Sequence, residues 1–166
     1  MESPRLMNHG LTLDRLFHKT IRTGRGTGLK DGKSELTYGE FYDRILNIAM
    51  NLHRDVGENR VISVMDWNTI NFALLIYAIP LSGNILHPVD VRQPPDQIIA
   101  SMKEAGSTYL IYSRDFGKLA GAAVSSGILP EDRVFDQEGL VSQYGTFGGG
   151  KLWLPEIHED RKASIL

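Results

Sequence analysis

Apolar residues recur with a helical period in the first part of the chain. One amphipathic helix is predicted over residues 12–23, with an apolar face made of Leu13, Leu16, Phe17 and Ile21. A second helix is predicted to start after Thr37 and to end before Gly57, with an apolar face made of Phe41, Ile45, Ile48, Ala49 and Leu52. Asp31-Gly32 lies between short apolar segments and predicts a hairpin ahead of the second helix.

Thr37 and Glu40 define the start of the second helix. A threonine followed three residues later by a glutamate is a capping box, in which each side chain accepts a hydrogen bond from the backbone N–H of the other residue. Leu36 and Phe41 flank this pair and are expected to pack together as a hydrophobic staple. The second helix is therefore interpreted as scaffold.

From Val61 onwards, short apolar runs alternate with helical segments. Strands are predicted at residues 61–64, 85–86, 109–112 and 133–135. Helices are predicted at residues 69–81, 95–105 and 115–125. Because strands that alternate with helices pair in parallel through right-handed crossovers, we predict an α/β fold with a doubly wound, mainly parallel sheet and flanking helices.

These patterns divide the chain into three regions. Residues 1–60 hold the first helix, the hairpin and the capped helix, and residues 61–135 hold the alternating strands and helices. Residues 136–166 mix glycines with isolated apolar residues and are expected to be irregular, apart from a short strand considered at Leu152–Leu154. Ala163–Leu166 have the pattern of an opening buried strand, so we expect a truncated chain whose natural sequence continues.

Composition restricts the classes of function. The chain has 166 residues, of which 42% are hydrophobic, as expected for one soluble globular domain. Its 18 Lys and Arg against 20 Asp and Glu give a formal charge of -2, so no nucleic-acid partner is expected. The absence of cysteine excludes disulfides, thiolate zinc sites and cysteine nucleophiles. The longest apolar run, Phe72–Leu81, is shorter than the roughly 20 residues of a transmembrane segment, and with no secretory signal a cytoplasmic location is expected.

Residues 145–152 match most of a phosphate-binding loop. Gly145 and the pair Gly150-Lys151 have the Walker A spacing, but Leu152 stands where the Mg²⁺-binding serine or threonine is required. No apolar strand leads into this segment, and Pro155 limits any helix after it. A surface turn is the favoured interpretation, and a degenerate P-loop nucleotide binder centred on Lys151 is an alternative.

Polar residues follow the first two predicted strands, where α/β sheets bind their ligands. Asp66 and Asn68 come after the first strand, and Asp90 and Arg92 come after the second. Both loops are candidates for the border of a ligand crevice. In the alternative interpretation, Asp66 and Asn68 cap the next helix and Trp67 packs on that helix.

The sequence predicts neither a metal site nor a catalytic residue within the chain. Its five histidines lack metal-ligand spacing, and no G-x-S-x-G elbow exposes a serine nucleophile. His87 ends the second predicted strand and is interpreted as a hydrogen-bonded structural histidine in preference to a ligand.

Several segments taken together resemble the adenylate-forming enzymes, the superfamily of acyl-CoA synthetases, firefly luciferases and peptide-synthetase adenylation domains. Glu35–Phe41 resembles the L-T-Y-x-E-F/L motif of that superfamily, and Arg60–Val64 resembles its D-R-V-A-V strand. Tyr77–Arg92 is similar to the Y-x-A-x-P-x-x-G-A-V-L-H-x-x-N-x-R-L pattern of medium- and long-chain fatty acyl-CoA synthetases. His87 and Arg92 are kept, and Asp90 stands where asparagine is usual.

The resemblance implies part of the large N-terminal domain of an ATP-dependent fatty acid–CoA ligase. Such enzymes use ATP, Mg²⁺ and CoA, and their phosphate loop, Mg²⁺-binding glutamate and catalytic lysine correspond to sequence beyond Leu166. The chain alone is therefore expected to be inactive and to bind none of these cofactors tightly. The resemblance also implies that Lys118 and Arg92 hold the 3′-phosphate of CoA, since basic side chains form charge-assisted hydrogen bonds with phosphate.

The predicted truncation has a consequence for association, and one further class of function is an alternative to the ligase. A truncated domain exposes a sheet edge or an apolar patch, so homodimer formation or other self-association is expected. A free-standing doubly wound binding or regulatory module, resembling a flavodoxin or a receiver, is an alternative. A receiver requires a phospho-acceptor aspartate after its third strand, where Ser113 and Arg114 stand.

Overall fold

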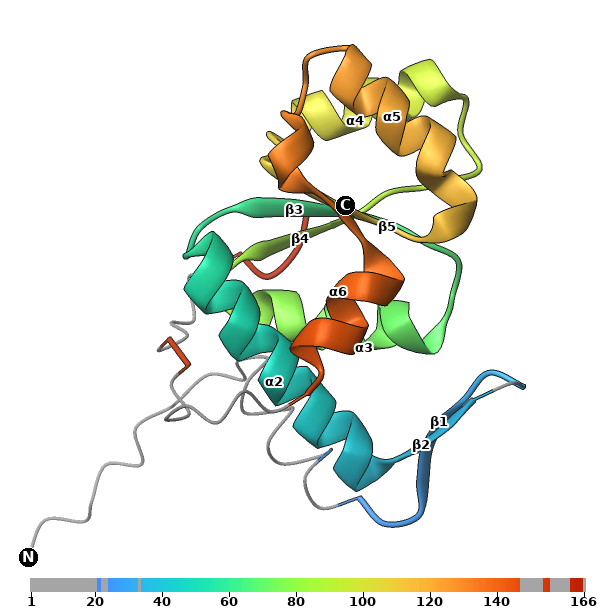
Figure 1. Cartoon of the computed structure of the whole chain (residues 1–166), viewed down its shortest axis with the longest axis vertical. Helices are drawn as coiled ribbons and strands as arrows, with labels where there is room; N and C mark the ends of the chain where they lie inside the picture. The colour runs from blue at the N-terminus through green and yellow to red at the C-terminus, as the bar shows by residue number, and fades with distance from the viewer. Residues whose placement is uncertain (1–20, 22–23, 33, 147–153, 156–161, 166) are drawn as a thin grey trace, which may run out of the picture.

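A parallel sheet of four strands forms the centre of the computed structural model (Figure 1). The structure describes residues 21, 24–32, 34–146, 154–155 and 162–165. The strands are β3 (Val61–Met65), β4 (Ile85–Pro88), β5 (Tyr109–Tyr112) and β6 (Val134–Asp136), in the spatial order β4-β3-β5-β6. Every neighbouring pair is parallel. The predicted sheet and the order of its strands along the chain are confirmed.

Helices cover both faces of this sheet, as a doubly wound fold requires. The helices are α2 (Tyr38–Val56), α3 (Ile70–Leu81), α4 (Pro95–Glu104), α5 (Gly117–Ser125) and α6 (Gln137–Tyr144). α4 and α5 lie on one face, and α2, α3 and α6 lie on the other (Figure 1). Within β3, Ile62 and Val64 join the core under α2 and α3, whereas Met65 joins the core under α4 and α5. This alternation follows from the two-residue period of a strand.

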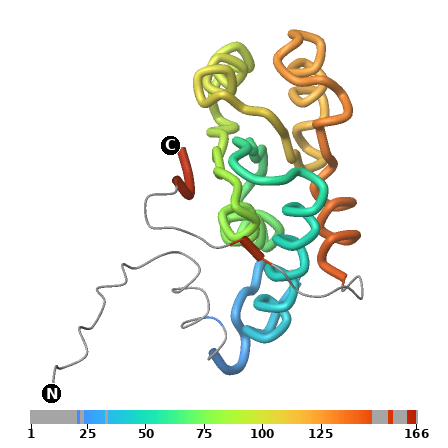
Figure 2. Tube along the Cα trace, turned by 90° about the vertical axis from the view of Figure 1, so that its left-hand side faces the viewer, coloured from blue at the N-terminus to red at the C-terminus, as the bar shows by residue number. Residues whose placement is uncertain are grey.

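The predicted hairpin and capping box are both present. β1 (Thr27–Lys30) pairs antiparallel with β2 (Glu35–Thr37), at the end of the molecule farthest from α4 and α5 (Figure 2). The backbone N–H of Glu40 donates to Thr37 Oγ1 at 3.2 Å, and the N–H of Thr37 donates to Glu40 Oε2 at 2.9 Å. Leu36 and Phe41 are both buried. The five apolar residues predicted to face the core from this helix are all buried as well.

α3 is buried along much of its length and has almost no polar face. Its residues Leu74, Leu75, Ala78 and Ile79 are fully buried between the sheet and α2. Its N-cap is Thr69, whose Oγ1 accepts the N–H of Phe72 at 3.2 Å. Within the described ranges, none of the helices has the length and apolarity to cross a membrane.

α6 corrects the expectation that residues 136–166 are irregular. Asp136 caps this helix by accepting the N–H of Gly139 at 2.8 Å. Leu140, Val141 and Tyr144 bury their side chains in the core under α2 and α3. The sequence signal was weak because the helix has eight residues and contains a glycine. The strand considered at Leu152–Leu154 and the helix predicted over residues 12–23 lie mostly outside the described residues.

The last described residues add a short pairing to the edge of the sheet at β4. The N–H of Leu86 donates to Ala163 O at 2.9 Å, and the N–H of Ile165 donates to Leu86 O at 2.8 Å, which forms a parallel bridge between Leu86 and Ser164. The buried strand predicted here is present only as this isolated bridge, and Ala163 and Ile165 are half-buried.

Candidate functional site

A cleft of about 400 Å³ opens at the carboxyl ends of β3 and β4. The loop after β3 leads to α3 on one face of the sheet, and the loop after β4 leads to α4 on the other face. Loops that diverge in this way leave a crevice, which is where open α/β sheets bind ligands. The residues that line it are Asp66, Trp67, Asn68, Phe72, Pro88, Val89, Asp90, Val91 and Arg92. The two loops predicted to border a crevice are therefore brought together.

Asp66 holds the β3–α3 loop in place and has little capacity left for a ligand. Its carboxylate accepts hydrogen bonds from the backbone N–H of Trp67 at 2.7 Å, from the hydroxyl of Thr69, and from the side-chain amide of Gln137 at 2.8 Å. Asp66 is 8% exposed and Gln137 is 1% exposed. The Asp66 carboxylate therefore stabilises the β3–α3 loop, which lines the cleft, and connects this loop to Gln137.

Trp67 stands at the rim of the cleft with 49% of its surface exposed. Its Nε1–H donates to Asp115 Oδ2 at 3.2 Å, and its ring lies 5.1 Å from the ring of Phe116. The alternative interpretation of this loop is thus corrected in two respects: Thr69 is the residue that caps α3, and the ring contact of Trp67 is with the segment before α5. The sequence could not show this contact because the partners come from two different strand ends.

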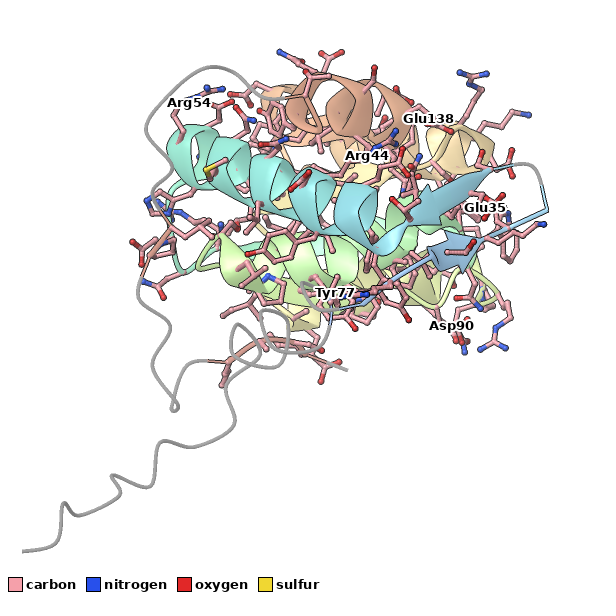
Figure 3. All side chains as sticks on the ribbon, turned by 90° about the horizontal axis from the view of Figure 1, so that it is seen from below. Glu35, Arg44, Arg54, Tyr77, Asp90 and Glu138 are labelled. Atoms are coloured by element: carbon pink, nitrogen blue, oxygen red, sulfur yellow. The ribbon has the colours of Figure 1, made fainter. Side chains whose placement is uncertain are left out.

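Arg92 and Asp90 form a paired charge on the opposite rim. Arg92 Nε donates to Asp90 Oδ1 at 2.8 Å, and Arg92 Nη2 donates to Asp90 Oδ2 at 3.2 Å. The hydrogen bonds from Arg92 lower the pKa of Asp90 to about 2, and the same contact raises the pKa of Arg92. Asp90 lies at the periphery of the molecule (Figure 3), and the Arg92 side chain is 80% exposed. This pairing uses Nε and Nη2 of the guanidinium, and no hydrogen bond is assigned to Nη1 among the described residues.

Lys118 occupies a neighbouring position and does not line this cleft. It is the second residue of α5 and is exposed. β4, which leads to Arg92, and β5, which leads to Lys118, flank β3 on its two sides. Arg92 and Lys118 therefore follow the strands on either side of β3, and Trp67 lies in the loop after β3.

His87 is a structural histidine, as the favoured interpretation had it. It is 6% exposed, and its Nδ1 lies 2.8 Å from Ser63 Oγ on the adjacent strand, which in turn contacts Ser107 Oγ. Burial lowers the pKa of His87, which favours the neutral ring. His87 does not line the cleft.

The Walker-like segment has the wrong element in front of it. α6 leads directly into Gly145, whereas a P-loop follows a strand. Lys151, the centre of the P-loop alternative, lies outside the described residues. Across the part of the chain that the structure describes, no group of three or more His, Asp or Glu side chains could hold a metal ion.

Comparison with known proteins identifies the family. Residues 17–146 match the family model described as AMP-binding enzyme. The chain belongs to this family of adenylate-forming enzymes, as its sequence motifs indicated. It is 32% identical over 95 residues to a probable peroxisomal acyl-activating enzyme and to a peroxisomal benzoate–CoA ligase, both of Arabidopsis thaliana. These matches cover 57% of the chain and only 16% of each of those relatives.

Solved structures confirm the fold. Coronafacic acid ligase from Pectobacterium brasiliense superposes with a TM-score of 0.77 at 17% identity, over 93% of this chain and 33% of that one. A fatty acyl-CoA synthetase of Mycobacterium tuberculosis superposes with a TM-score of 0.76 at 14% identity, over 92% of this chain and 31% of that one. The fold is that of the N-terminal domains of acyl-CoA synthetases.

Proposed function

We propose that the chain is the N-terminal part of an ATP-dependent ligase that converts a fatty acid into its CoA thioester. The carboxylate attacks the α-phosphorus of MgATP and releases pyrophosphate, and the thiol of CoA then displaces AMP from the acyl-adenylate. The observation that carries this proposal is the family match over residues 17–146. The fatty acyl-CoA synthetase pattern over Tyr77–Arg92 supports the acyl class.

The proposal assigns a scaffolding role to this part of the protein. A carboxylate oxygen is a poor leaving group and AMP is a good one, so catalysis consists mainly of positioning and of charge neutralisation at phosphate. Of the polar side chains near the cleft, Asp66 is engaged with donors of the protein and His87 is buried in the sheet. We therefore propose that the 166-residue chain is inactive alone and that ATP and Mg²⁺ act at groups supplied by the complete protein.

The acid substrate needs a direct test because the similar proteins carry different names. They include a benzoate–CoA ligase and a coronafacic acid ligase beside a fatty acyl-CoA synthetase. The complete protein is incubated with ATP, Mg²⁺, CoA and one acid from a panel of fatty acids of several lengths and benzoate. We expect acid-dependent release of AMP with fatty acids. Release of AMP with benzoate and with none of the fatty acids would overturn the fatty acyl assignment, while the assignment as a CoA ligase would stand.

Arg92 and Lys118 are proposed to contact the 3′-phosphate of CoA. Both are exposed at the carboxyl edge of the sheet, and the pairing of Arg92 with Asp90 fixes the direction of its guanidinium. Replacing either residue by glutamine in the complete protein is expected to raise KM for CoA several-fold and to leave KM for ATP unchanged. Lys103→Gln, an exposed position on α4, is the matched control. If Arg92→Gln and Lys118→Gln have the same KM for CoA as the control Lys103→Gln, neither residue contacts the 3′-phosphate.

The extent of the natural protein separates the ligase from a free-standing module. The source gene is read past the codon for Leu166. An in-frame loop rich in Gly, Ser and Thr that ends in Pro-Lys-Gly supports the ligase, whereas a stop codon supports the module. We also propose a cytoplasmic location, which fluorescence microscopy of the tagged complete protein tests against the peroxisomal location named for two relatives.

A further inference from the structure

α6 is held at both ends by side chains from distant parts of the chain. At its first residue, the amide of Gln137 donates to Asp66 Oδ2 at 2.8 Å, in the loop after β3. At its last residue, the hydroxyl of Tyr144 donates to Asp55 Oδ2 at 2.6 Å, on the neighbouring helix α2 (Figure 1). Gln137 and Tyr144 are both buried. The two ends of α6 are therefore bonded to two different elements of the fold.

A row of polar side chains on α2 binds the carboxyl-terminal end of α6. Asn51 Nδ2 donates to Tyr144 O at 3.2 Å, and Asn47 Nδ2 donates to Gly145 O at 3.2 Å. With Asp55, these residues are spaced four apart, which places them on one face of α2. The last carbonyls of a helix have no partner within the helix, so α2 satisfies groups that α6 cannot satisfy by itself.

The packing of α6 on the sheet is incomplete. A hollow of about 110 Å³ opens between α6 and β6, and the residues that line it are Phe135, Asp136, Leu140, Gln143 and Tyr144. Oε2 of Glu138 is buried without a hydrogen-bond partner among the described residues. A hollow forfeits van der Waals contacts, and a buried oxygen without a donor has lost its hydration. Both features raise the free energy of the helix in its docked position.

We propose that α6 undocks from α2 and from the sheet as one unit, and that this opening releases the β3–α3 loop. A helix of eight residues is marginal by itself, so the loss of contacts at one end removes support from the other end. The amide of Gln137 then leaves Asp66, whose carboxylate orders the loop through the N–H of Trp67 and the hydroxyl of Thr69. Local openings of this kind require less free energy than global unfolding.

The alternative is fraying, in which the last turn of α6 opens alone. Eight helical residues span roughly 12 Å, and contacts more than about 7–10 Å apart usually act independently. Under fraying, a substitution at one end of α6 changes amide exchange at that end only. Under the opening of the whole unit, a substitution at either end changes exchange at both ends.

Amide hydrogen exchange in the complete protein distinguishes these two cases. Tyr144→Phe removes the hydroxyl that binds Asp55 and keeps the ring. We expect this variant to speed exchange throughout α6, and at the N–H groups of Trp67 and Thr69, by about five- to thirtyfold. Asp43→Asn, at an exposed position of α2, is the control and is expected to leave these rates unchanged. Acceleration confined to the last turn of α6 would overturn the proposal.

A substitution at the other end provides the converse test. Gln137→Ala is expected to speed exchange of the Gly145 N–H, which donates to Val141 O at 2.9 Å, as much as it speeds exchange in the β3–α3 loop. Gln143→Ala, at an exposed position of α6, is the control. Unchanged exchange at Gly145 in Gln137→Ala would show that the two ends of α6 open independently.

Exchange in low concentrations of urea separates this opening from global unfolding. The amides of α6 and of the β3–α3 loop are expected to share one opening free energy, which is lower than that of Val64 in the central strand β3. An opening free energy of α6 equal to that of Val64 would overturn the proposal. The measurement uses no substrate, so its result does not depend on the proposed ligase activity.

Discussion

The side-chain amide of Gln137 donates to Asp66 Oδ2 at 2.8 Å, across 71 positions of sequence. Gln137 is the first residue of α6, and Asp66 directly follows β3. The contact joins the last described helix to the loop that forms one wall of the cleft. It also leaves the buried carboxylate of Asp66 fully engaged with donors from the protein.

Replacement of Gln137 by alanine tests how much this hydrogen bond contributes to stability. The variant leaves the buried Asp66 carboxylate short of one donor, which is expected to lower the free energy of unfolding by about 1–3 kcal/mol. Urea denaturation measures the change. Gln143→Ala, at an exposed position of the same helix, is the control and is expected to change stability by no more than about 0.5 kcal/mol. Equal effects of the two substitutions would show that the hydrogen bond to Asp66 contributes nothing.

The capping box at Thr37 makes a second prediction. Thr37→Ala removes the hydroxyl that accepts the N–H of Glu40, and it is expected to cost about 1 kcal/mol of stability. Thr37→Ser keeps the hydroxyl and is expected to stay close to the original protein. Thermal unfolding followed by circular dichroism compares the two. An equal loss of stability in the serine and alanine variants would show that the Thr37 hydroxyl does not stabilise the helix as its N-cap.

His87 predicts a loss of stability in mild acid. Burial lowers the pKa of His87 in the folded chain below its ordinary value of 6.5, so the unfolded chain binds a proton at His87 that the folded chain does not. The free energy of unfolding is therefore expected to fall as the pH decreases through 6.5 towards the lowered pKa, and to be independent of His87 at higher pH.

Denaturation of the protein and of His87→Gln between pH 5 and pH 7.5 measures this contribution. The glutamine variant is expected to be less stable at pH 7.5 and to show a shallower decline towards pH 5. Carboxylates whose pKa values are lowered, such as Asp90, lose their contributions at more acidic pH and do not enter this window. Parallel declines in the two proteins would contradict the assignment of a neutral buried His87.

The apolar surface of α3 predicts self-association. Phe72, Ala73 and Ile76 are half-buried on a helix that has almost no polar face, so apolar surface stays in contact with water. Sedimentation of the 166-residue chain at increasing concentration is expected to show dimers or larger species. Ile76→Lys is expected to reduce them, and Lys103→Gln serves as the control. A monomer at all concentrations would contradict the prediction.

Local patterns were sufficient for most of the fold. The strands and helices between Thr27 and Ser125 have clear apolar periods, defined caps or terminal glycines, and these signals depend only on nearby residues. α6 was missed because Gly139 and its short length dilute the helical signal, although Asp136 is a good N-cap. Packing against α2 and the hydrogen bond from Gln137 to Asp66 stabilise α6, and neither contact is visible in a local pattern.

The candidate site was predictable in place and only partly in detail. The rule that ligands bind beyond the carboxyl ends of strands pointed to the loops of Asp66 and Arg92, and both loops line one cleft. The contact of Gln137 with Asp66 and the orientation of Trp67 by Asp115 both join distant parts of the chain. They depend on the strand order β4-β3-β5-β6, which local sequence does not encode.

Acid-dependent exchange of pyrophosphate into ATP is the most direct test of the central claim. The exchange reports the reversible formation of an acyl-adenylate with release and rebinding of pyrophosphate, and it requires neither CoA nor the release of AMP. We expect exchange with a fatty acid in the complete protein and none in the 166-residue chain. No exchange by the complete protein with any carboxylic acid, or full exchange by the 166-residue chain, would contradict it.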